Sequence, residues 1–440
     1  MNNKKWMAIL LGGIMAASLV APCSVSAAEK TTLTFWHAMG GTNGEVLQQI
    51  VDDFNASQDE IEIKAEYQGT YDDTITKLKA AMQSESGLPD VCQMYDVGTK
   101  FMYDSGAVIP VEDKFESTGY DKSSVMDVIS SYYTVEGKQY AMPFNVSTPM
   151  LYYNKDVFEA AGLDPETPPT TYDEVLEDAK KIVESGAAPV GYSQAIYGWF
   201  FEQQLAGLGV TYGNNDNGRT EAVTAVDFDS NGGGLKVFDM WKKLYDSGYF
   251  EDYGTTTADT QTAFFSGQVG MIIESTAILK NAVDSSPFEV GTGYLPRIEQ
   301  NDEGGVIIGG GSLWLTDTGN EANEDAAWKF IEYITTPDVQ AKWSMGTGYF
   351  AINEKAYETD DMKAYLEENP NFMTAINQLK DSPVNCNTAG VLSGVQTEAR
   401  LTFNEIMPQV YDGKLTTQDA VDQLAASVNK AIENYNESIK

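Results

Sequence analysis

The stretch Met142-Pro-Phe-Asn-Val-Ser-Thr-Pro-Met-Leu-Tyr-Tyr-Asn-Lys155 changes character at its middle. It opens with Pro143 and Asn145, residues that interrupt regular backbone structure, and continues with the small hydroxyl side chains of Ser147 and Thr148. The apolar, aromatic run 150–153 that follows is typical of a buried strand. Asn154 then predicts the N-terminal cap of a helix. We expect a polar connecting segment that leads directly into a core strand where a chain leaves one lobe and begins a second, and we call such a segment a crossing.

The sequence before this stretch alternates between two periodicities. Residues 33–37, 61–65 and 91–95 read as strands, and residues 46–54 and 75–82 carry apolar side chains at helical spacing. The order β-α-β-α-β predicts an α/β fold in which a parallel sheet has helices on both faces. Since no G-x-G-x-x-G motif follows the first strand, a dinucleotide is not implied.

Ligands of open parallel sheets bind beyond the carboxyl ends of the strands. The side chains placed there are Trp36, His37, Met39, Tyr71 and Asp96. Aromatic rings are platforms for sugar rings, and those with polar or glycine neighbours are the better candidates, although each could equally be core. The rings that meet this test are Trp36, Tyr71, Trp199 and Tyr349.

The rest of the chain predicts a second lobe and a return to the first. We expect a capping box at Thr171 and Glu174, a polar surface loop at 214–218, and a second crossing at 274–276. The segment 307–315 reads as a strand interrupted by glycines, and Thr417 as the cap of a terminal helix. These features divide the chain into lobe 1, residues 31–142 with 276–335, and lobe 2, residues 143–275 with 336–440.

Length and charge narrow the functional classes. A chain of 440 residues is long for one core, which favours two domains. The net charge of -37 argues against nucleic acid and anionic membrane surfaces, because both would repel the chain. A solvated acidic surface is the simpler interpretation of this charge, and capture of a cationic ligand is the alternative.

The N-terminus is typical of an export signal. Lys4 and Lys5 precede the apolar run 6–20, and Val25-Ser-Ala27 fits a small-residue cleavage site, so residues 1–27 are a predicted signal peptide. A lipoprotein signal that ends at Cys23 is the alternative. The mature protein is therefore expected in the periplasm or at the extracellular face of the cytoplasmic membrane, either free or tethered by lipid.

The remaining thiols and the single histidine limit other chemistry. Cys92 reads as a small core residue, and its disulfide with Cys386 stays an open possibility in an exported protein. With His37 as the only histidine, and without metal-ligand spacing, the sequence predicts neither a metal site nor a cofactor.

Several short motifs, in this order and spacing, resemble the extracytoplasmic solute-binding proteins of bacterial ABC importers. The resemblance is to the carbohydrate-type family, especially its glycerol-3-phosphate-binding branch, and covers nearly all of the mature chain. The motifs are P-F-N-x-S-T-P-x-L-Y-Y-N-K-D from Pro143, Ala161-Gly-Leu-Asp-Pro165, Phe35-Trp-His-Ala-Met39, Tyr95-Asp-Val-Gly-Thr99, Ile307-Ile-Gly-Gly-Gly-Ser-Leu-Trp314 and Thr347-Gly-Tyr349.

The resemblance implies a two-lobe periplasmic-binding-protein-like fold with a ligand cleft between the lobes. It also implies that Asp96, one carbon shorter than the family glutamate, accepts ligand hydroxyls. The other positions that it assigns to the cleft are Tyr71, Ser147, Trp199, Ser275 or Thr276, Gly309 with Gly310 as the register alternative, and Tyr349.

One position departs from the family pattern. The family has an arginine in a G-L-R-L-G-N segment that holds the ligand phosphate, and Leu392 falls there in this chain. Arg400 matches a different family arginine. An anion without a fixed cation in an acidic protein is poorly bound. We therefore expect an uncharged polyol, sugar or glycoside, with glycerol-3-phosphate or a glycerophosphodiester as the alternative.

The leading hypothesis is a monomeric, non-enzymatic binding protein that closes about a hinge on a small hydroxylated solute and delivers it to membrane permease subunits. A secreted glycoside hydrolase is the alternative, since a pair of carboxylates suffices for that chemistry. No local motif singles out such a pair. A surface adhesin would show repeats or a wall anchor, and the sequence has neither.

Overall fold

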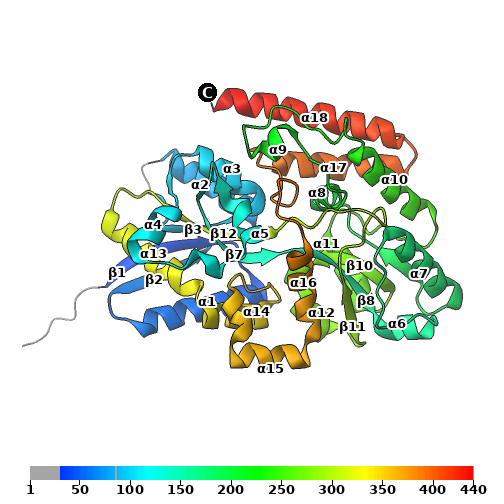
Figure 1. The fold of residues 1–440 in the computed structure, drawn as a ribbon, viewed down its shortest axis with the longest axis horizontal. Coiled ribbons are helices and arrows are strands. Elements are labelled where there is room, and N and C mark those ends of the chain that lie inside the picture. Colours follow the sequence, from blue (N-terminus) through cyan, green and yellow to red (C-terminus); the bar gives the residue numbers. More distant parts are fainter. Residues whose placement is uncertain (1–29, 85–86, 440) are drawn as a thin grey trace, which may run out of the picture.

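The computed structural model describes residues 30–84 and 87–439, which form two lobes, each built on its own sheet (Figure 1). The predicted signal peptide and Cys23 lie outside these residues. Within the described ranges, no helix has the length and apolarity needed to cross a membrane.

The first sheet has the strand order β2-β1-β3-β12-β4, and β7 also pairs with β12. The predicted parallel pairing is confirmed, because β1 runs parallel to both β2 and β3. Strand β12 is antiparallel to β3, β4 and β7. The strands are β1 (Thr31–His37), β2 (Ile61–Tyr67), β3 (Val91–Tyr95), β4 (Val108–Ile109), β7 (Met142–Ser147) and β12 (Gly309–Thr316).

The second sheet has the order β11-β8-β10-β9. Its residues alternate between two cores, as the two-residue period of a strand requires. Met150 and Tyr152 face the core shared with the first lobe, whereas Leu151 and Tyr153 face the core of the second lobe. The strands are β8 (Pro149–Asn154), β9 (Val190–Ser193), β10 (Val269–Ser275) and β11 (Val290–Gly293). A separate hairpin joins β5 (Thr134–Val135) and β6 (Lys138–Gln139).

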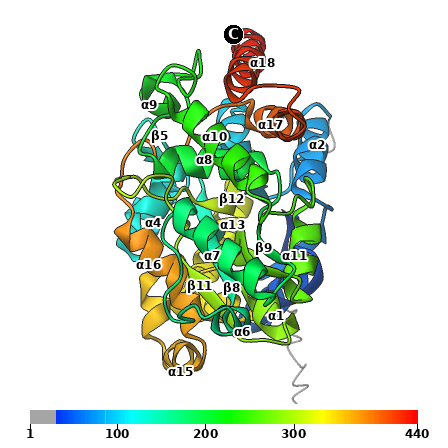
Figure 2. The ribbon, with the colours of Figure 1, turned by 90° about the vertical axis from the view of Figure 1, so that its right-hand side faces the viewer.

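The helices α17 and α18 pack together at one end of the molecule, and α15 lies at the other (Figures 1 and 2). The helices that precede β10 are α1 (Gly41–Ser57), α2 (Tyr71–Met82), α3 (Thr99–Asp104), α4 (Glu112–Thr118), α5 (Asp127–Ser130), α6 (Lys155–Ala160), α7 (Tyr172–Ser185), α8 (Gly198–Gly207), α9 (Asn214–Gly218), α10 (Gly233–Asp246) and α11 (Thr257–Phe265). Those that follow it are α12 (Leu279–Ser285), α13 (Glu321–Ile334), α14 (Pro337–Thr347), α15 (Asp360–Glu368), α16 (Thr374–Asp381), α17 (Gln396–Tyr411) and α18 (Thr417–Ser438).

The chain passes from the first sheet to the second at Thr148, as predicted from the opening stretch. The predicted return at 274–276 is wrong, because β11, the next strand, still belongs to the second sheet. The hydroxyl of Ser275 instead caps a short 3-10 helix by accepting the Ala277 N–H at 3.2 Å. The chain returns to the first sheet through residues 294–308, between β11 and β12.

Two strands belong to a different sheet from the one that the predicted lobe ranges imply. Strand β7, placed in lobe 2 by the division after residue 142, pairs with β12 of the first sheet. Strand β11, placed in lobe 1, pairs with β8 of the second sheet. The cause is the position of the crossings: the first follows β7, and the second follows β11.

Local predictions have mixed outcomes. The caps at Asn154 and Thr171 are confirmed, and the cap of the terminal helix is Thr416 rather than Thr417. Cys92 and Cys386 are both free thiols. The predicted polar loop 214–218 lies near the surface as α9, whose residues 215–217 have left-handed backbone angles, and its buried Asn217 accepts two backbone N–H groups and donates to the Cys386 carbonyl.

Candidate functional site

A buried ion cluster joins the two lobes. Asp96 follows β3 of the first sheet, while Glu202 on α8 and Arg400 on α17 belong to the second lobe. The Arg400 Nη2 donates to Asp96 Oδ2 at 2.6 Å and to Glu202 Oε2 at 2.7 Å. Its Nε donates to Glu202 Oε1 at 2.8 Å, an oxygen that also accepts the Gln396 amide at 2.9 Å. One guanidinium therefore bridges carboxylates of both lobes.

Burial and mutual attraction compete in this cluster. Burial alone would lower the pKa of Arg400, but the carboxylates of Asp96 and Glu202 together raise it well above its usual value. Burial raises the pKa of Glu202, and the guanidinium offsets only part of that effect. With both carboxylates ionised, the cluster carries one net negative charge. Among the described residues, Asp96 Oδ1 accepts no hydrogen bond, so it is available to a ligand hydroxyl.

A polar aromatic network lies next to Asp96 on the first lobe. Tyr71, at the start of α2, stacks on Tyr95 with ring centroids 5.2 Å apart. The Asn145 amide donates to the Tyr71 hydroxyl at 2.7 Å, and the hydroxyl of Tyr349 joins the same network. Burial raises the pKa of Tyr71, and the charge of Asp96 contributes to this shift. Both tyrosines therefore stay neutral and can donate or accept hydrogen bonds.

Across this network, Trp199 of α8 packs on the glycine run at the start of β12. Gly309 lies opposite Ser147 in the β12–β7 register. A Cβ at Gly309 would lie 2.6 Å from Trp199 Cζ2, so only glycine admits the indole here. The buried Trp199 Nε1 has no hydrogen-bond partner among the described residues. Gly310 has a φ of +86° and its backbone approaches Asn145, which explains the second glycine.

Ser275 and Thr276 lie beside the first crossing. The Thr276 N–H donates to the Thr148 carbonyl at 2.9 Å, and the Thr148 N–H donates to Thr276 Oγ1 at 3.3 Å. The Tyr152 hydroxyl donates to the Ser275 carbonyl at 2.7 Å. This segment and Ser147 therefore flank the same residue, Thr148.

The structure does not connect Trp36 and His37 to this group. The Trp36 Nε1 donates to Glu66 at 2.9 Å, and His37 packs between Phe35 and Tyr67. Burial lowers the pKa of His37 to about 4, so the ring is neutral. Within the described residues, the hydrogen bonds and ring contacts of both side chains are with β1, β2 and the turn after β1.

Sequence reasoning missed Glu202 and Gln396 and did not place Arg400 in the cleft. Glu202 follows Phe200 and Phe201 in a helix that is buried on nearly all sides. A carboxylate within such an apolar run is costly unless it is paired. That conflict in the sequence is a usable signal for a functional acid. In residues 30–84 and 87–439, no group of histidine, cysteine, aspartate and glutamate is arranged to hold a metal ion.

Comparisons with known proteins show the family of this chain. The family model described as bacterial extracellular solute-binding protein matches residues 49–374. The sn-glycerol-3-phosphate-binding periplasmic protein UgpB of Escherichia coli (strain K12) is 31% identical over 417 residues, which cover 93% of this chain and 94% of that protein.

Solved structures with similar folds include two binding proteins. The cyclic alpha-maltosyl-1,6-maltose binding protein from Arthrobacter globiformis has a TM-score of 0.76 and 26% identity, covering 92% of this chain and 100% of its own. UgpB from Mycobacterium tuberculosis, in complex with glycerophosphocholine, has a TM-score of 0.79 and 20% identity over 93% of this chain and 100% of its own. The chain therefore belongs to the bacterial extracellular solute-binding proteins, the substrate-binding components of ABC importers.

Proposed function

We propose that this chain binds an uncharged, hydroxylated solute, such as a sugar, a glycoside or a polyol, in the cleft between its lobes. The observation that carries the proposal is the buried cluster of Asp96, Arg400 and Glu202. The carboxylates of Asp96 and Glu202 together accept three hydrogen bonds from the Arg400 guanidinium. The positive charge of Arg400 is therefore already neutralised and does not compensate the charge of an anionic ligand. A phosphate monoester carries about two negative charges at neutral pH, and it would meet a cluster that is already negative.

The proposed ligand contacts come from both lobes. Asp96 Oδ1 accepts a sugar hydroxyl, the network of Tyr71 and Tyr349 supplies further donors and acceptors, and the indole face of Trp199 supports the sugar ring. The other proposed contacts are Ser147, Ser275, Thr276 and the backbone of Gly309 and Gly310. Trp36 and His37 stay sequence predictions that no contact described above supports.

The proposed mechanism is hinge closure about the two crossings. The cluster joins Asp96 of one lobe to Arg400 of the other, so it forms only when the lobes approach each other. A ligand that contacts both sides stabilises the closed form by its difference in affinity between the two states. The closed surface is then recognised by permease subunits. We further propose that the protein is exported and monomeric, with a lipid anchor at Cys23 as the alternative to complete release.

A phosphate-containing ligand is the second candidate, because one similar protein is named for binding sn-glycerol-3-phosphate and the solved structure of another is a complex with glycerophosphocholine. The structural support for it is Arg400 Nη1, which makes no hydrogen bond among the described residues. Both candidates involve binding without turnover. Asp96 and Glu202 are both held by Arg400, whereas a glycosidase needs one carboxyl group free to protonate the leaving oxygen. We therefore propose that the protein has no hydrolytic activity.

A thermal-shift screen of neutral sugars, polyols and sn-glycerol-3-phosphate tests the proposal. A ligand at 100 times its Kd stabilises the folded state by about 2.7 kcal/mol. We expect stabilisation by a neutral compound, loss of that shift in Asp96→Asn, and recovery of the compound unchanged. Stabilisation by sn-glycerol-3-phosphate alone, or release of a cleavage product, would contradict the proposal.

A further inference from the structure

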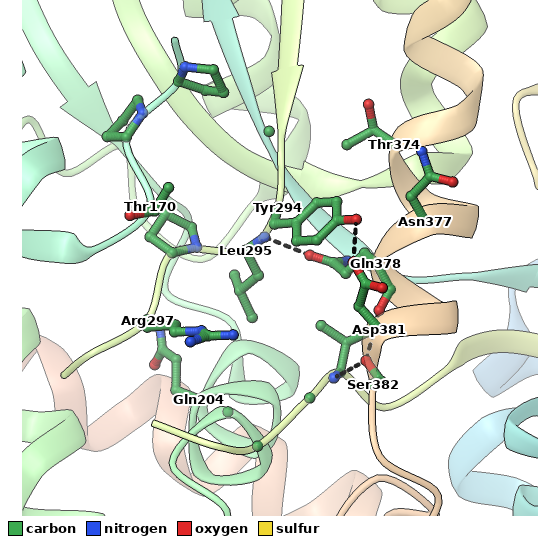
Figure 3. Close-up of a pocket in the computed structure, with 18 of the residues that line it drawn as sticks. Thr170, Gln204, Tyr294, Leu295, Arg297, Thr374, Asn377, Gln378, Asp381 and Ser382 are labelled. Carbon is green, nitrogen blue, oxygen red and sulfur yellow. Dashed lines mark hydrogen bonds between the residues drawn. The ribbon is translucent and has the colours of Figure 1, made fainter. Parts of the chain in front are cut away.

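A cavity of about 550 Å³ lies outside the cleft cluster, against the second crossing (Figure 3). Its walls are the 168–170 loop, the end of α8, residues 292–306 and α16. Its size falls within the range of about 300–1,000 Å³ that is usual for small-molecule sites. None of the residues that we assign to the cleft lines it.

The cavity wall holds both crossings together through Gln378, a buried residue of α16. Its Oε1 accepts the Leu295 N–H at 2.6 Å, where the second crossing begins. Its Nε2 donates to the Pro149 carbonyl at 2.9 Å, where the first crossing ends. One turn later, Ser382 Oγ accepts the Val306 N–H at 3.2 Å and donates to the Gln378 carbonyl at 2.8 Å. A shift of α16 therefore moves both hinge segments.

The polar groups of the cavity suit a neutral ligand. Tyr294 is 40% exposed there, and its hydroxyl donates to Asp381 at 2.8 Å, which fixes the ring as a flat platform. Figure 3 shows the Arg297 guanidinium directed toward the α16 wall. The charged side chains of the lining are one cation, Arg297, and one anion, Asp381, so the formal charge of the wall is zero. Pro168 and Pro169 add apolar surface.

The wall also offers hydrogen-bonding groups that are not used internally. The side chains of Arg297 and Asn377 form no hydrogen bond or salt bridge with any described residue. This contrasts with the other two arginines of the chain. Arg400 is held by two carboxylates, and Arg219 donates to the backbone carbonyls of Tyr132 and Gly390. An aromatic platform flanked by free amide and guanidinium donors is an arrangement that binds sugar hydroxyls and ring faces.

We propose that this cavity is a second binding site for a small neutral hydroxylated molecule of monosaccharide or disaccharide size. Its ligand lies between α16 and the second crossing, so occupancy changes the hinge equilibrium through Gln378. The site is separate from the cleft and does not depend on the cleft ligand being the one proposed above.

Calorimetric titration with glucose and with maltose, at millimolar concentrations, tests the site. The Asp96→Asn variant disables the cleft, Asn377→Trp fills the cavity, and Tyr294→Ala removes the platform. Glu367→Trp, on the exposed side of α15, is the matched control for a surface tryptophan. We expect at least one sugar to bind Asp96→Asn, with that binding lost when either cavity substitution is added and retained when Glu367→Trp is added.

The outcomes separate the two proposals. Sugar binding that disappears in Asp96→Asn and is unchanged in Asn377→Trp overturns the second site and leaves the cleft proposal standing. Binding that survives Asp96→Asn and disappears in Asn377→Trp supports the second site and assigns that sugar to the cavity. No binding of either sugar to the Asp96→Asn protein overturns the second site.

Small-angle scattering tests the coupling to the hinge. Saturating sugar should change the radius of gyration of Asp96→Asn, and adding Gln378→Glu should abolish that change, because a carboxylate cannot donate to the Pro149 carbonyl. A radius that is unchanged at saturation, or a change that persists with Gln378→Glu, overturns the coupling.

Discussion

Replacing Arg400 with methionine should destabilise the protein strongly. The substitution leaves Asp96 and Glu202 buried without their common partner, both less than a tenth exposed. Breaking a buried ion pair by removing one partner costs about 3–5 kcal/mol, because the remaining charge is left uncompensated. Here two carboxylates lose that partner, so we expect a value toward the upper end of this range.

The loss should depend on pH. Burial already raises the pKa of Glu202 above its usual value of 4.5, and without the guanidinium it rises further. A carboxyl group whose folded pKa is raised destabilises the protein above that pKa and ceases to do so once protonated. The difference between Arg400→Met and wild type should therefore be largest at neutral pH and shrink as the pH falls through the raised pKa toward 4.5.

Urea unfolding followed by circular dichroism, at neutral pH and near the usual carboxyl pKa, measures both effects. Lys342→Met is the control, because it breaks an exposed salt bridge to Asp53 and should cost less than about 1 kcal/mol. Adding Glu202→Gln to Arg400→Met should restore part of the loss. If Arg400→Met costs no more than Lys342→Met, or the same at both pH values, the reasoning about this cluster is refuted.

Four further substitutions give sharp outcomes. Burial raises the pKa of Glu274, so Glu274→Gln should raise the melting temperature at pH 7, and the melting temperatures of variant and wild type should converge below pH 4.5. An unchanged or lower melting temperature of the variant at pH 7, measured by calorimetry, would contradict this prediction. Gly309→Ala should displace the buried Trp199, and so weaken ligand binding in titrations as well as lower the melting temperature, whereas Gly310→Ala should lower the melting temperature with a smaller effect on binding; an equal loss of binding in the two variants would contradict the assignment. Leu392→Arg should increase affinity for sn-glycerol-3-phosphate by about tenfold, and no gain in a correctly folded variant would show that this side chain does not face the ligand.

Local patterns of the sequence predicted the parts of the fold that depend on short-range chemistry. The strand–helix alternation before Tyr95 and the capping residue Asn154 are properties of neighbouring residues, and the structure confirms them. The position of the second crossing was not predictable in this way. Ser275 and Thr276 have the composition of a crossing, but whether β11 pairs with β8 is decided by strands far apart in the sequence.

The candidate site shows the same limit. Tyr71 could be placed near Asp96 from the order of the strands, and Ser147, Gly309 and Tyr349 could be added to them from the family resemblance. The partner of Asp96 could not, because Arg400 lies 304 residues away on a helix of the other lobe. Pairing of charges across a cleft depends on how the lobes close, and no periodicity in the sequence records that geometry.

Calorimetric titration of the wild-type protein with sn-glycerol-3-phosphate and with a panel of neutral sugars and glycosides tests the central claim most directly. We predict saturable, stoichiometric binding of a neutral compound, lost in Asp96→Asn, and no comparable heat from sn-glycerol-3-phosphate. Micromolar or tighter binding of sn-glycerol-3-phosphate, with no neutral compound bound, would contradict the account.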